Sequence, residues 1–307
     1  MSDQSKDDII FDRTLLADPG LVQSLSPLVR RVLAPNKGPF TFTGTCTYIL
    51  GKGHLALIDP GPDVAEHIEL LLMQLRGESI DHIVITHTHR DHSPAARAIK
   101  AATGAKIIGC APHQPDQTKT IGRIDASHDL DHLPDLIMQN GDVLSADGFH
   151  LEAIATPGHA SNHLCFALPE ENSLFSGDHV MAWSTTIVAP PDGNMADYMA
   201  SLEKLRSRGE HIFWPGHGGP VQDPQRFMRG LAQHRRQREA AILKCLASDQ
   251  GTIAEIVARI YEGIDPRLTM GASLSVLAHL EDLLNRNFIE AESGHASLDG
   301  HYKLKGG

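Results

Sequence analysis

The sequence predicts an α/β protein in which two β-sheets pack together with helices on their outer faces, followed by a small winged-helix domain. Runs typical of strands alternate with helical segments in two similar halves up to residue 223, and this alternation predicts the two covered sheets. Helices and then a small hairpin end the chain, which is the order of elements in a winged helix. We expect a large domain over 1–223, a connecting helix over 224–248 and a winged-helix-like domain over 249–307.

The first half of the large domain starts with a weakly patterned stretch, residues 1–38, and continues with a β-hairpin. Its strands are FTFTGTCTYIL (40–50) and HLALID (54–59), and Gly51-Lys52-Gly53 supplies the turn between them. The elements expected next are a helix over 64–76, a strand over 82–86, a helix over 94–103 with Ser93 as its N-cap, and a strand over 105–110.

The second half begins with a stretch over 111–148 that is rich in Asp, His, Pro and Gly and is expected to be mostly loop. The alternation then resumes with strands over 150–156, 164–168 and 174–177, a helix over 196–207 and a last strand over 211–214. In the C-terminal domain, Thr252 and Glu255 have the spacing of a capping box. The leucines that mark its next helix are Leu274, Leu277, Leu280 and Leu284, and the segments FIEAE and HYKLK then form the hairpin.

The composition is that of an ordinary globular chain with an excess of histidine. Hydrophobic residues make up 41% of the chain, the net charge is −11, and no apolar run is long enough for a membrane helix. The acidic N-terminus does not resemble a signal peptide, and the four distant cysteines form no CxxC pair, so we expect a reducing, cytoplasmic location without disulfides. The 19 histidines exceed what packing requires and indicate metal binding.

The strongest chemical signal is the run Thr-His-Thr-His-Arg-Asp-His at 86–92. His87 and His89 alternate along an extended segment that leaves a strand, so their side chains point to one side. Asp91 and His92 lie beside them where the next helix begins. Three imidazoles and a carboxylate at this spacing suit one or two divalent metal ions.

Supporting ligands follow three later strands. They are His159 in TPGH, Asp178 in SGD and His217 in PGHG, and each stands beside a glycine where the backbone must bend. A single Gly-His after a strand is most often only a turn. Together with residues 86–92, the three complete a set of five histidines and two carboxylates, which is enough for two metal ions.

These motifs resemble those of the metallo-β-lactamase superfamily, whose HxHxDH signature stands here as His87, His89, Asp91 and His92. The resemblance covers about residues 40–220 and implies an αββα sandwich with a dinuclear site, usually of zinc, with Mn²⁺ or Fe²⁺ as alternatives. It implies that His87, His89 and His159 hold one ion, that Asp91, His92 and His217 hold the other, and that Asp178 bridges them. Asp59 in IDPG matches the carboxylate that orients a ligand imidazole in this family.

Within the superfamily, the chain looks most like the lactamase-β-like group that has a C-terminal winged helix and includes a single-strand endoribonuclease. The segments TGTCTYILG (43–51), GHASNH (158–163), STTIV (184–188) and DYMASL (197–202) carry this likeness, with Cys46 where the group usually has Asn. Secreted β-lactamases fit less well, because they have Cys or Arg at ligand positions that are Asp178 and His92 here.

The resemblance implies hydrolysis by a metal-bridging hydroxide, with Asp91 taking the proton and delivering it to the leaving group. The substrate we favour is a small carboxylic ester, thioester or lactone; the alternatives are an RNA phosphodiester and a DNA-binding regulator with structural metals. Residues 1–223 carry 16 Lys and Arg against 28 Asp and Glu, which disfavours polyanions. The C-terminal domain is also acidic, so we expect no DNA binding. Its role is predicted to be packing on the large domain beside the substrate entrance, and the oligomeric state is left open.

Several other residues have two interpretations. His163 either polarises a substrate oxygen or, as we favour, is a buried histidine bonded to the backbone in support of the site. Tyr198 is expected in the core, and Met181 and Trp183 either line a pocket or simply pack. The basic residues of the connecting helix either steer an anionic substrate or form a solvated face. The remaining histidines have no partner spacing and are expected in solvated loops, among them His128, His132 and His150.

Overall fold

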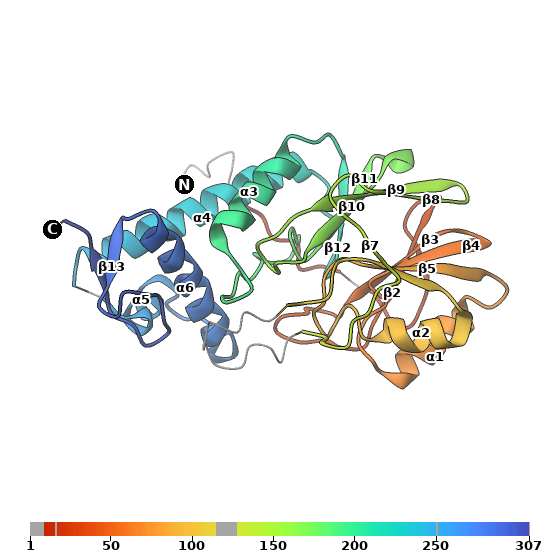
Figure 1. Cartoon of the computed structure of the whole chain (residues 1–307), viewed down its shortest axis with the longest axis horizontal. Coiled ribbons are helices and arrows are strands. Elements are labelled where there is room, and N and C mark those ends of the chain that lie inside the picture. Colours follow the sequence, from red (N-terminus) through yellow and green to blue (C-terminus); the bar gives the residue numbers. More distant parts are fainter. Residues whose placement is uncertain (1–8, 16, 115–127, 250, 307) are drawn as a thin grey trace.

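The computed structural model describes residues 9–15, 17–114, 128–249 and 251–306. Its larger sheet has seven strands in the order β1-β2-β3-β4-β5-β6-β7. They are β1 (Gln23–Ser24), β2 (Val29–Leu33), β3 (Cys46–Lys52), β4 (His54–Ile58), β5 (Ser79–Ile85), β6 (Lys106–Gly109) and β7 (Leu136–Ile137). The strands from β1 to β4 are antiparallel, and those from β4 to β7 are parallel. The helices α1 (Ala65–Gln74) and α2 (Ala95–Thr103) cover its outer face (Figure 1).

The second sheet has five strands in the order β12-β11-β10-β9-β8. They are β8 (Val143–Ala146), β9 (Phe149–Ala155), β10 (Leu164–Leu168), β11 (Ser173–Gly177) and β12 (Ile212–Pro215), and a short 3₁₀ helix, η2 (Pro169–Glu171), joins β10 to β11. Its outer face is covered by α3 (Met195–Arg206) and the first part of α4 (Pro224–Leu246), as Figure 1 shows. Asp223 caps α4 by accepting a hydrogen bond from the backbone N–H of Arg226 (3.1 Å), and Pro224 occupies its first turn.

One apolar core fills the space between the two sheets. It contains Leu57 and Ile83 from the larger sheet and Phe166, Phe175 and Trp214 from the smaller one, all buried. A second core, which includes Tyr198 of α3, lies between the smaller sheet and its helices. The molecule therefore has the four layers, helix-sheet-sheet-helix, that the sequence predicted.

The C-terminal residues form a small domain of their own with a third apolar core. Its elements are α5 (Ile253–Ile260), the 3₁₀ helix η3 (Pro266–Leu268), α6 (Thr269–Asn285), β13 (Ile289–Ala291) and β14 (Tyr302–Leu304). The predicted capping box is present, since Thr252 Oγ1 accepts from the backbone N–H of Glu255 and the Glu255 carboxylate accepts from that of Thr252. The domain lies at the opposite end of the molecule from α1 and α2 (Figure 1).

Some local predictions were wrong. The strand expected over 40–50 begins only at Cys46, and the weakly patterned N-terminal stretch contains β1 and β2. The stretch over 111–148 is mostly loop in its described part, as predicted, and contributes only the short strands β7 and β8; its residues 115–127 lie outside the described part of the chain. Ser93 does not cap α2: its hydroxyl donates to Asp129 (2.9 Å), and the helix begins at Ala95 without a side-chain cap.

The four cysteines are buried and free, as expected of a chain without disulfides. Among the described residues, no helix combines the length and the apolar character that crossing a membrane requires.

The core of the C-terminal domain can be tested with two residues of α6. Leu277 is fully buried, so Leu277→Ala leaves a cavity and should lower the free energy of unfolding by about 2–5 kcal/mol. Met270, on the same helix, is 61% exposed, so Met270→Ala should change it by less than about 0.5 kcal/mol. Urea unfolding of the full chain, followed by circular dichroism, measures both; equal effects would contradict the described packing.

Candidate metal centre

The seven side chains selected from the sequence meet at one end of the two sheets. The segment carrying His87, His89, Asp91 and His92 follows β5 of the larger sheet. The other three, His159, Asp178 and His217, follow β9, β11 and β12 of the smaller sheet. Ligands from both sheets can therefore face one another only because the sheets pack face to face.

Three histidines form the first group. Nδ1 of His89 lies 3.0 Å from Nε2 of His87 and 3.0 Å from Nε2 of His159. Ring nitrogens that meet at this distance repel each other unless a proton or a cation lies between them. The group is therefore able to hold a metal ion.

Asp91, His92 and His217 form the second group. Nε2 of His217 lies 3.1 Å from Oδ2 of Asp91 and 3.3 Å from Nε2 of His92. Asp178 lies between the groups: its carboxylate oxygens are 3.4 Å from His217, 3.5 Å from His92 and 3.6 Å from His159. Donor atoms around a zinc ion are roughly 3.3–3.6 Å apart when the bonds are about 2.0–2.2 Å long.

The outer nitrogens of the ligand imidazoles are held by fixed acceptors. Nδ1 of His159 donates to the carbonyl of Ile187 (2.6 Å), and Nδ1 of His217 donates to that of Gly44 (3.2 Å). Nδ1 of His92 donates to the carboxylate of Asp59 (2.9 Å). Each bond leaves Nε2 as the nitrogen that faces the centre, as in well-ordered metal sites.

Asp59 has further partners in the same segment. It is 2% exposed and accepts hydrogen bonds from the backbone N–H (2.8 Å) and the hydroxyl (2.6 Å) of Thr86. Its φ of 48° is unusual for a residue with a side chain, which shows that its surroundings hold it in place. Asp59 thus lies where the sequence placed it, behind His92.

His163 supports the centre from behind Asp178. Its Nδ1 lies 2.8 Å from the hydroxyl of Thr156, and its Nε2 accepts a hydrogen bond from the backbone N–H of Asp178 (3.2 Å). This is the contact expected of a buried histidine bonded to the backbone. With Nε2 engaged in this way, His163 has no nitrogen left to reach a substrate oxygen.

The close approach of the two sheets requires glycine at position 216. A Cβ atom there would lie 2.6 Å from both Oδ1 of Asp178 and Cε1 of His92, closer than real atoms come. Glycine is therefore needed beside His217 because a larger residue would clash with the side chains of the centre.

Burial and neighbouring charges set the protonation of the cluster. Burial lowers the pKa of His87 and His89 well below the usual range, so both are neutral and ready to bind a cation. Burial also opposes a charged His217, but the carboxylates of Asp178 and Asp91 outweigh it and raise its pKa to about 10. Burial disfavours an ionised Asp91, but the nearby His92 and His217 hold its pKa well below the usual range. The centre therefore supplies both neutral imidazoles and ionised carboxylates.

Sequence reasoning missed the support that α4 gives to this site. Arg235 is 3% exposed, and its guanidinium donates to the carbonyl of Thr186. The Thr186 hydroxyl in turn donates to the carbonyls of Asp178 (2.7 Å) and His179 (3.0 Å). The suggestion that the basic residues of this helix form a solvated face or steer a substrate is therefore wrong for Arg235. The i, i+3, i+4 apolar pattern of the helix, which brings Arg235 to its inner face, could have revealed this.

The start of α6 also reaches this region. A Cβ atom at Gly271 would lie 3.3 Å from Phe40 and 3.6 Å from Ile187, whose carbonyl holds His159. The C-terminal domain therefore packs on the large domain next to the segment that carries a ligand contact.

The predictions for the remaining residues had mixed outcomes. Tyr198 is fully buried, Met181 is 4% exposed, and the Trp183 ring stacks on Phe42 with centroids 5.1 Å apart. Of the three histidines named as examples of solvated loop residues, His150 is exposed. His128 and His132 are each 4% exposed, because His128 packs on His89 and His132 contacts the Cys110 carbonyl.

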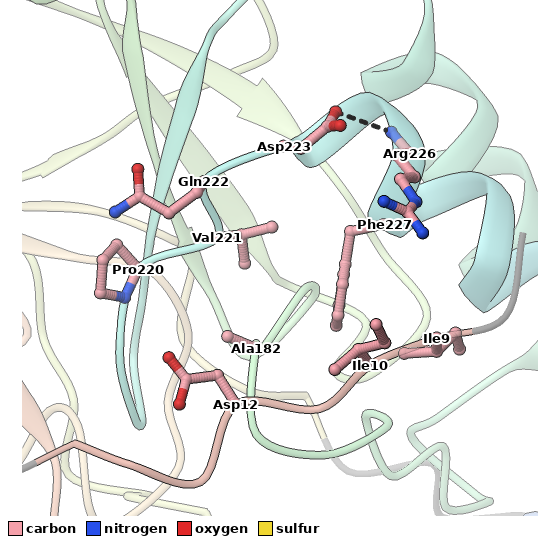
Figure 2. A pocket seen from close by; sticks show the side chains of 10 residues that line it. All are labelled: Ile9, Ile10, Asp12, Ala182, Pro220, Val221, Gln222, Asp223, Arg226 and Phe227. Atoms are coloured by element: carbon pink, nitrogen blue, oxygen red, sulfur yellow. Dashed lines mark hydrogen bonds between the residues drawn. The ribbon is translucent and has the colours of Figure 1, made fainter. Parts of the chain in front are cut away.

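A surface pocket of about 220 Å³ lies between the N-terminal segment and the start of α4, lined by apolar side chains such as Ile10 and Phe227 and by the charged Asp12 and Arg226 (Figure 2). None of the seven candidate ligands lines it. The pocket is therefore separate from the metal centre.

The family models agree with the fold. The model of the metallo-beta-lactamase superfamily matches residues 40–217, and that of the beta-lactamase associated winged helix domain matches residues 252–296. The chain belongs to the metallo-beta-lactamase superfamily and has a C-terminal winged helix.

Two similar proteins illustrate its place in the family. An atrochrysone carboxyl ACP thioesterase of Aspergillus terreus is 33% identical over 232 residues, which are 75% of this chain and 66% of that protein. A beta-lactamase-like protein 2 homolog of Caenorhabditis elegans is 32% identical over 275 residues, 88% of each chain. The chain thus spans just under two thirds of the thioesterase and most of the nematode protein.

Solved structures show the same fold at low sequence identity. A beta-lactamase domain protein from Burkholderia ambifaria has a TM-score of 0.79 at 17% identity, over 98% of this chain and 99% of that one. A metallo-beta-lactamase family protein from Thermus thermophilus has a TM-score of 0.74 at 22% identity, over 92% of this chain and 100% of that one.

The role of Asp59 can be tested by comparing two His–Asp pairs. Asp59→Asn keeps the size of the side chain but removes the charge that holds His92, and should weaken metal affinity by roughly 10- to 100-fold. Asp81→Asn is the matched control, because Asp81 also pairs with a histidine, His54 (2.7 Å), but on the exposed surface. Competition with a chromogenic chelator measures both; an unchanged affinity in Asp59→Asn would contradict the role.

Proposed function

We propose that this protein hydrolyses a small carboxylic ester, thioester or lactone at a centre of two divalent metal ions. His87, His89 and His159 would hold one ion, Asp91, His92 and His217 would hold the other, and Asp178 would bridge them. The observation that carries this proposal is the convergence of two groups of metal-binding side chains on Asp178.

The residues present fit such ions. Oδ1 of Asp178 is buried and has no hydrogen-bond partner among the described residues, which is costly unless a cation lies beside it. Imidazoles mixed with carboxylates favour zinc, with Mn²⁺ and Fe²⁺ as alternatives, over Mg²⁺ or Ca²⁺. When bound, two such ions polarise a substrate oxygen and make a nucleophile from water near neutral pH.

The protein's own residues would orient the ligands and move a proton. Asp91 has a side chain that is 28% exposed, against 9% for Asp178, so it is the carboxylate that solvent and substrate can reach. We assign it the transfer of a proton to the leaving group. Asp59, His163 and Thr186 hold the imidazoles and Asp178 in place and do not touch the substrate.

An acyl substrate is favoured over a nucleic acid by charge. Residues 1–223 have a net charge of −12 and residues 249–307 one of −4, both of which repel a polyanion. A helix that reads DNA needs an exposed basic face, whereas α6 has ten buried residues out of 17. The similarity to proteins named as thioesterases supports the acyl assignment. An RNA phosphodiester is the second candidate, because the chain resembles a group that includes an endoribonuclease.

The two ions can be tested by metal content. The purified protein should bind about two tight equivalents of divalent metal per chain. Asp178→Ala should lose hydrolysis and at least one equivalent, because it removes the bridging carboxylate. Asp147→Ala, at an exposed position of the β8–β9 turn, should keep both. Elemental analysis after dialysis measures this, and active protein without stoichiometric metal would refute the proposal.

The substrate class can be tested by comparing rates. Protein stripped by a chelator and reloaded with Zn²⁺ or Mn²⁺ should hydrolyse a carboxylic ester or thioester faster than it cleaves single-stranded RNA. His89→Ala, loaded in the same way, is the control for contaminating activity. If RNA were cleaved faster than every ester, and His89→Ala were inactive on it, the second candidate would replace the first.

A further inference from the structure

We propose that the acyl part of the substrate lies on an apolar surface at the junction of the two domains. This acyl surface is formed by Phe40 in the loop between β2 and β3, Ile187 in the segment between β11 and α3, and Met270 in the first turn of α6. The inference rests on the proposed function and adds a substrate class to it. That class is the esters or thioesters of linear acids with an apolar chain of medium length.

Three distant segments of the chain meet at Gly271, the residue after Met270 in α6. A Cβ atom at this glycine would lie 3.3 Å from Cε1 of Phe40 and 3.6 Å from Cδ1 of Ile187. Both side chains therefore reach the first turn of α6, which itself carries Met270. The large domain and the C-terminal domain thus contribute to the same surface.

The acyl surface is continuous with the metal centre. The carbonyl of Ile187 accepts the hydrogen bond from Nδ1 of His159 (2.6 Å), so the Ile187 side chain belongs to a residue that directly holds a candidate ligand. The loop that carries Phe40 also reaches the centre, since the carbonyl of Gly44 accepts from Nδ1 of His217 (3.2 Å). An acyl chain whose carbonyl carbon lies at the centre can therefore extend directly over this surface.

Part of the acyl surface is open to solvent. Phe40 is 44% exposed, and Met270 is 61% exposed. A single exposed apolar residue is common on protein surfaces and needs no explanation. Here the exposed side chains come from two domains and lie beside a candidate catalytic centre, and ligand sites are lined mostly by apolar and aromatic side chains. The substrate is therefore the apolar partner that covers them.

The loop that presents Phe40 is held in one conformation. Asn36 accepts a hydrogen bond from the backbone N–H of Thr45 (2.8 Å) and donates one to the Thr45 hydroxyl (2.9 Å). Phe42 has a φ of 55°, which is unfavourable for an aromatic residue, and its ring stacks on that of Trp183 with centroids 5.1 Å apart. Because the loop is already fixed, binding of an acyl chain does not have to order it first.

The position of Asp91 assigns this surface to the acyl part of the substrate and not to the leaving group. Asp91, the residue proposed to protonate the leaving group, lies 3.1 Å from Nε2 of His217. Ile187 instead holds His159, which belongs to the other group of candidate ligands. The leaving group lies on the Asp91 side of the scissile bond, so the acyl chain points toward Ile187.

The test is the dependence of hydrolysis on the length of the acyl chain. The metal-loaded, full-length protein is assayed with p-nitrophenyl esters of acetic, butyric, hexanoic and octanoic acid. From butyrate to octanoate, kcat/KM of the wild type should rise about tenfold or more, because each fully buried methylene contributes up to about fourfold. Lengthening the alcohol of an acetate ester from butyl to octyl should change kcat/KM by less than about threefold, because the acyl surface does not contact the leaving group.

Two variants remove parts of the acyl surface. Phe40→Ala and Met270→Ala should each lower kcat/KM for the octanoate about threefold or more beyond any change for the acetate, mainly by raising KM. Met73→Ala is the matched control and should keep the wild-type values for both esters. Met73 is also an exposed methionine of a helix (47%), but it lies in α1, at the opposite end of the molecule from the C-terminal domain (Figure 1).

A second measurement does not depend on catalysis. Octanamide is a neutral amide with the same chain as the octanoate, and acetamide is its short counterpart. In saturation-transfer NMR with the metal-stripped wild type, octanamide should give a signal and acetamide should not. Phe40→Ala should weaken the octanamide signal by a factor of about two or more, whereas Met73→Ala should leave it unchanged.

A wild type that hydrolyses these esters without preferring the longer acyl chain would overturn the acyl surface and leave the proposed hydrolysis standing. A chain-length preference that persists in both Phe40→Ala and Met270→Ala, or one for the longer alcohol instead, would also overturn it. If no ester is hydrolysed, the proposed function fails and the NMR measurement decides on the surface. Octanamide binding that Phe40→Ala weakens would then support an apolar chain at this position, and its absence would refute both proposals.

Discussion

The metal centre depends above all on the buried carboxylate of Asp59. This side chain lies just after β4 and binds the first residue after β5, Thr86, through both its backbone N–H and its hydroxyl. It also binds Nδ1 of His92. A buried carboxylate is tolerated only when such partners surround it, so the three bonds hold the ligand segment in one conformation against the sheet.

The second constraint is the packing of one sheet on the other. The larger sheet supplies four candidate ligands and the smaller sheet supplies three, and neither set forms the centre alone. The hydroxyl of Tyr48 in β3 donates to the carbonyl of Pro215 in β12 (2.8 Å), which ties the two sheets together two residues before His217. The glycine between them, Gly216, then lets the backbone pass close to Asp178 and His92. The apolar core thus sets the distance at which the ligands meet.

The C-terminal part of the chain belongs to the same structure. Arg235 of α4 is buried against the Tyr198 ring, 5.1 Å from its centroid, and binds the Thr186 carbonyl. Thr186 bonds to the backbone of Asp178, and the next residue, Ile187, bonds to His159. Arginine side chains contact phosphate groups in many nucleic-acid-binding proteins, but the Arg235 side chain is buried and binds the backbone of its own protein.

The sequence alone determined the class of the fold and predicted the candidate metal ligands. The candidate ligand segment 86–92 could be identified because its spacing is local. Alternation along an extended segment places the His87 and His89 side chains on the same side, independently of how the rest of the chain folds. The later ligands could be identified because glycines mark the ends of their strands. The covered sheets were predicted from the alternation of strand and helix segments, and the capping box from the spacing of Thr252 and Glu255; both are local features of the sequence.

The tertiary structure decided what depends on contacts between distant residues. Ser93 has the sequence of a helix cap, but Asp129, 36 residues later, accepts its hydroxyl instead. The strand β2 has little pattern of its own and forms because β3 pairs with it. His128 has the sequence surroundings of a loop residue, yet it is buried because its backbone bridges to His89 and its ring stacks on His113. Such burial has no local signal, since the free energy that favours it comes from partners that only the folded chain brings together.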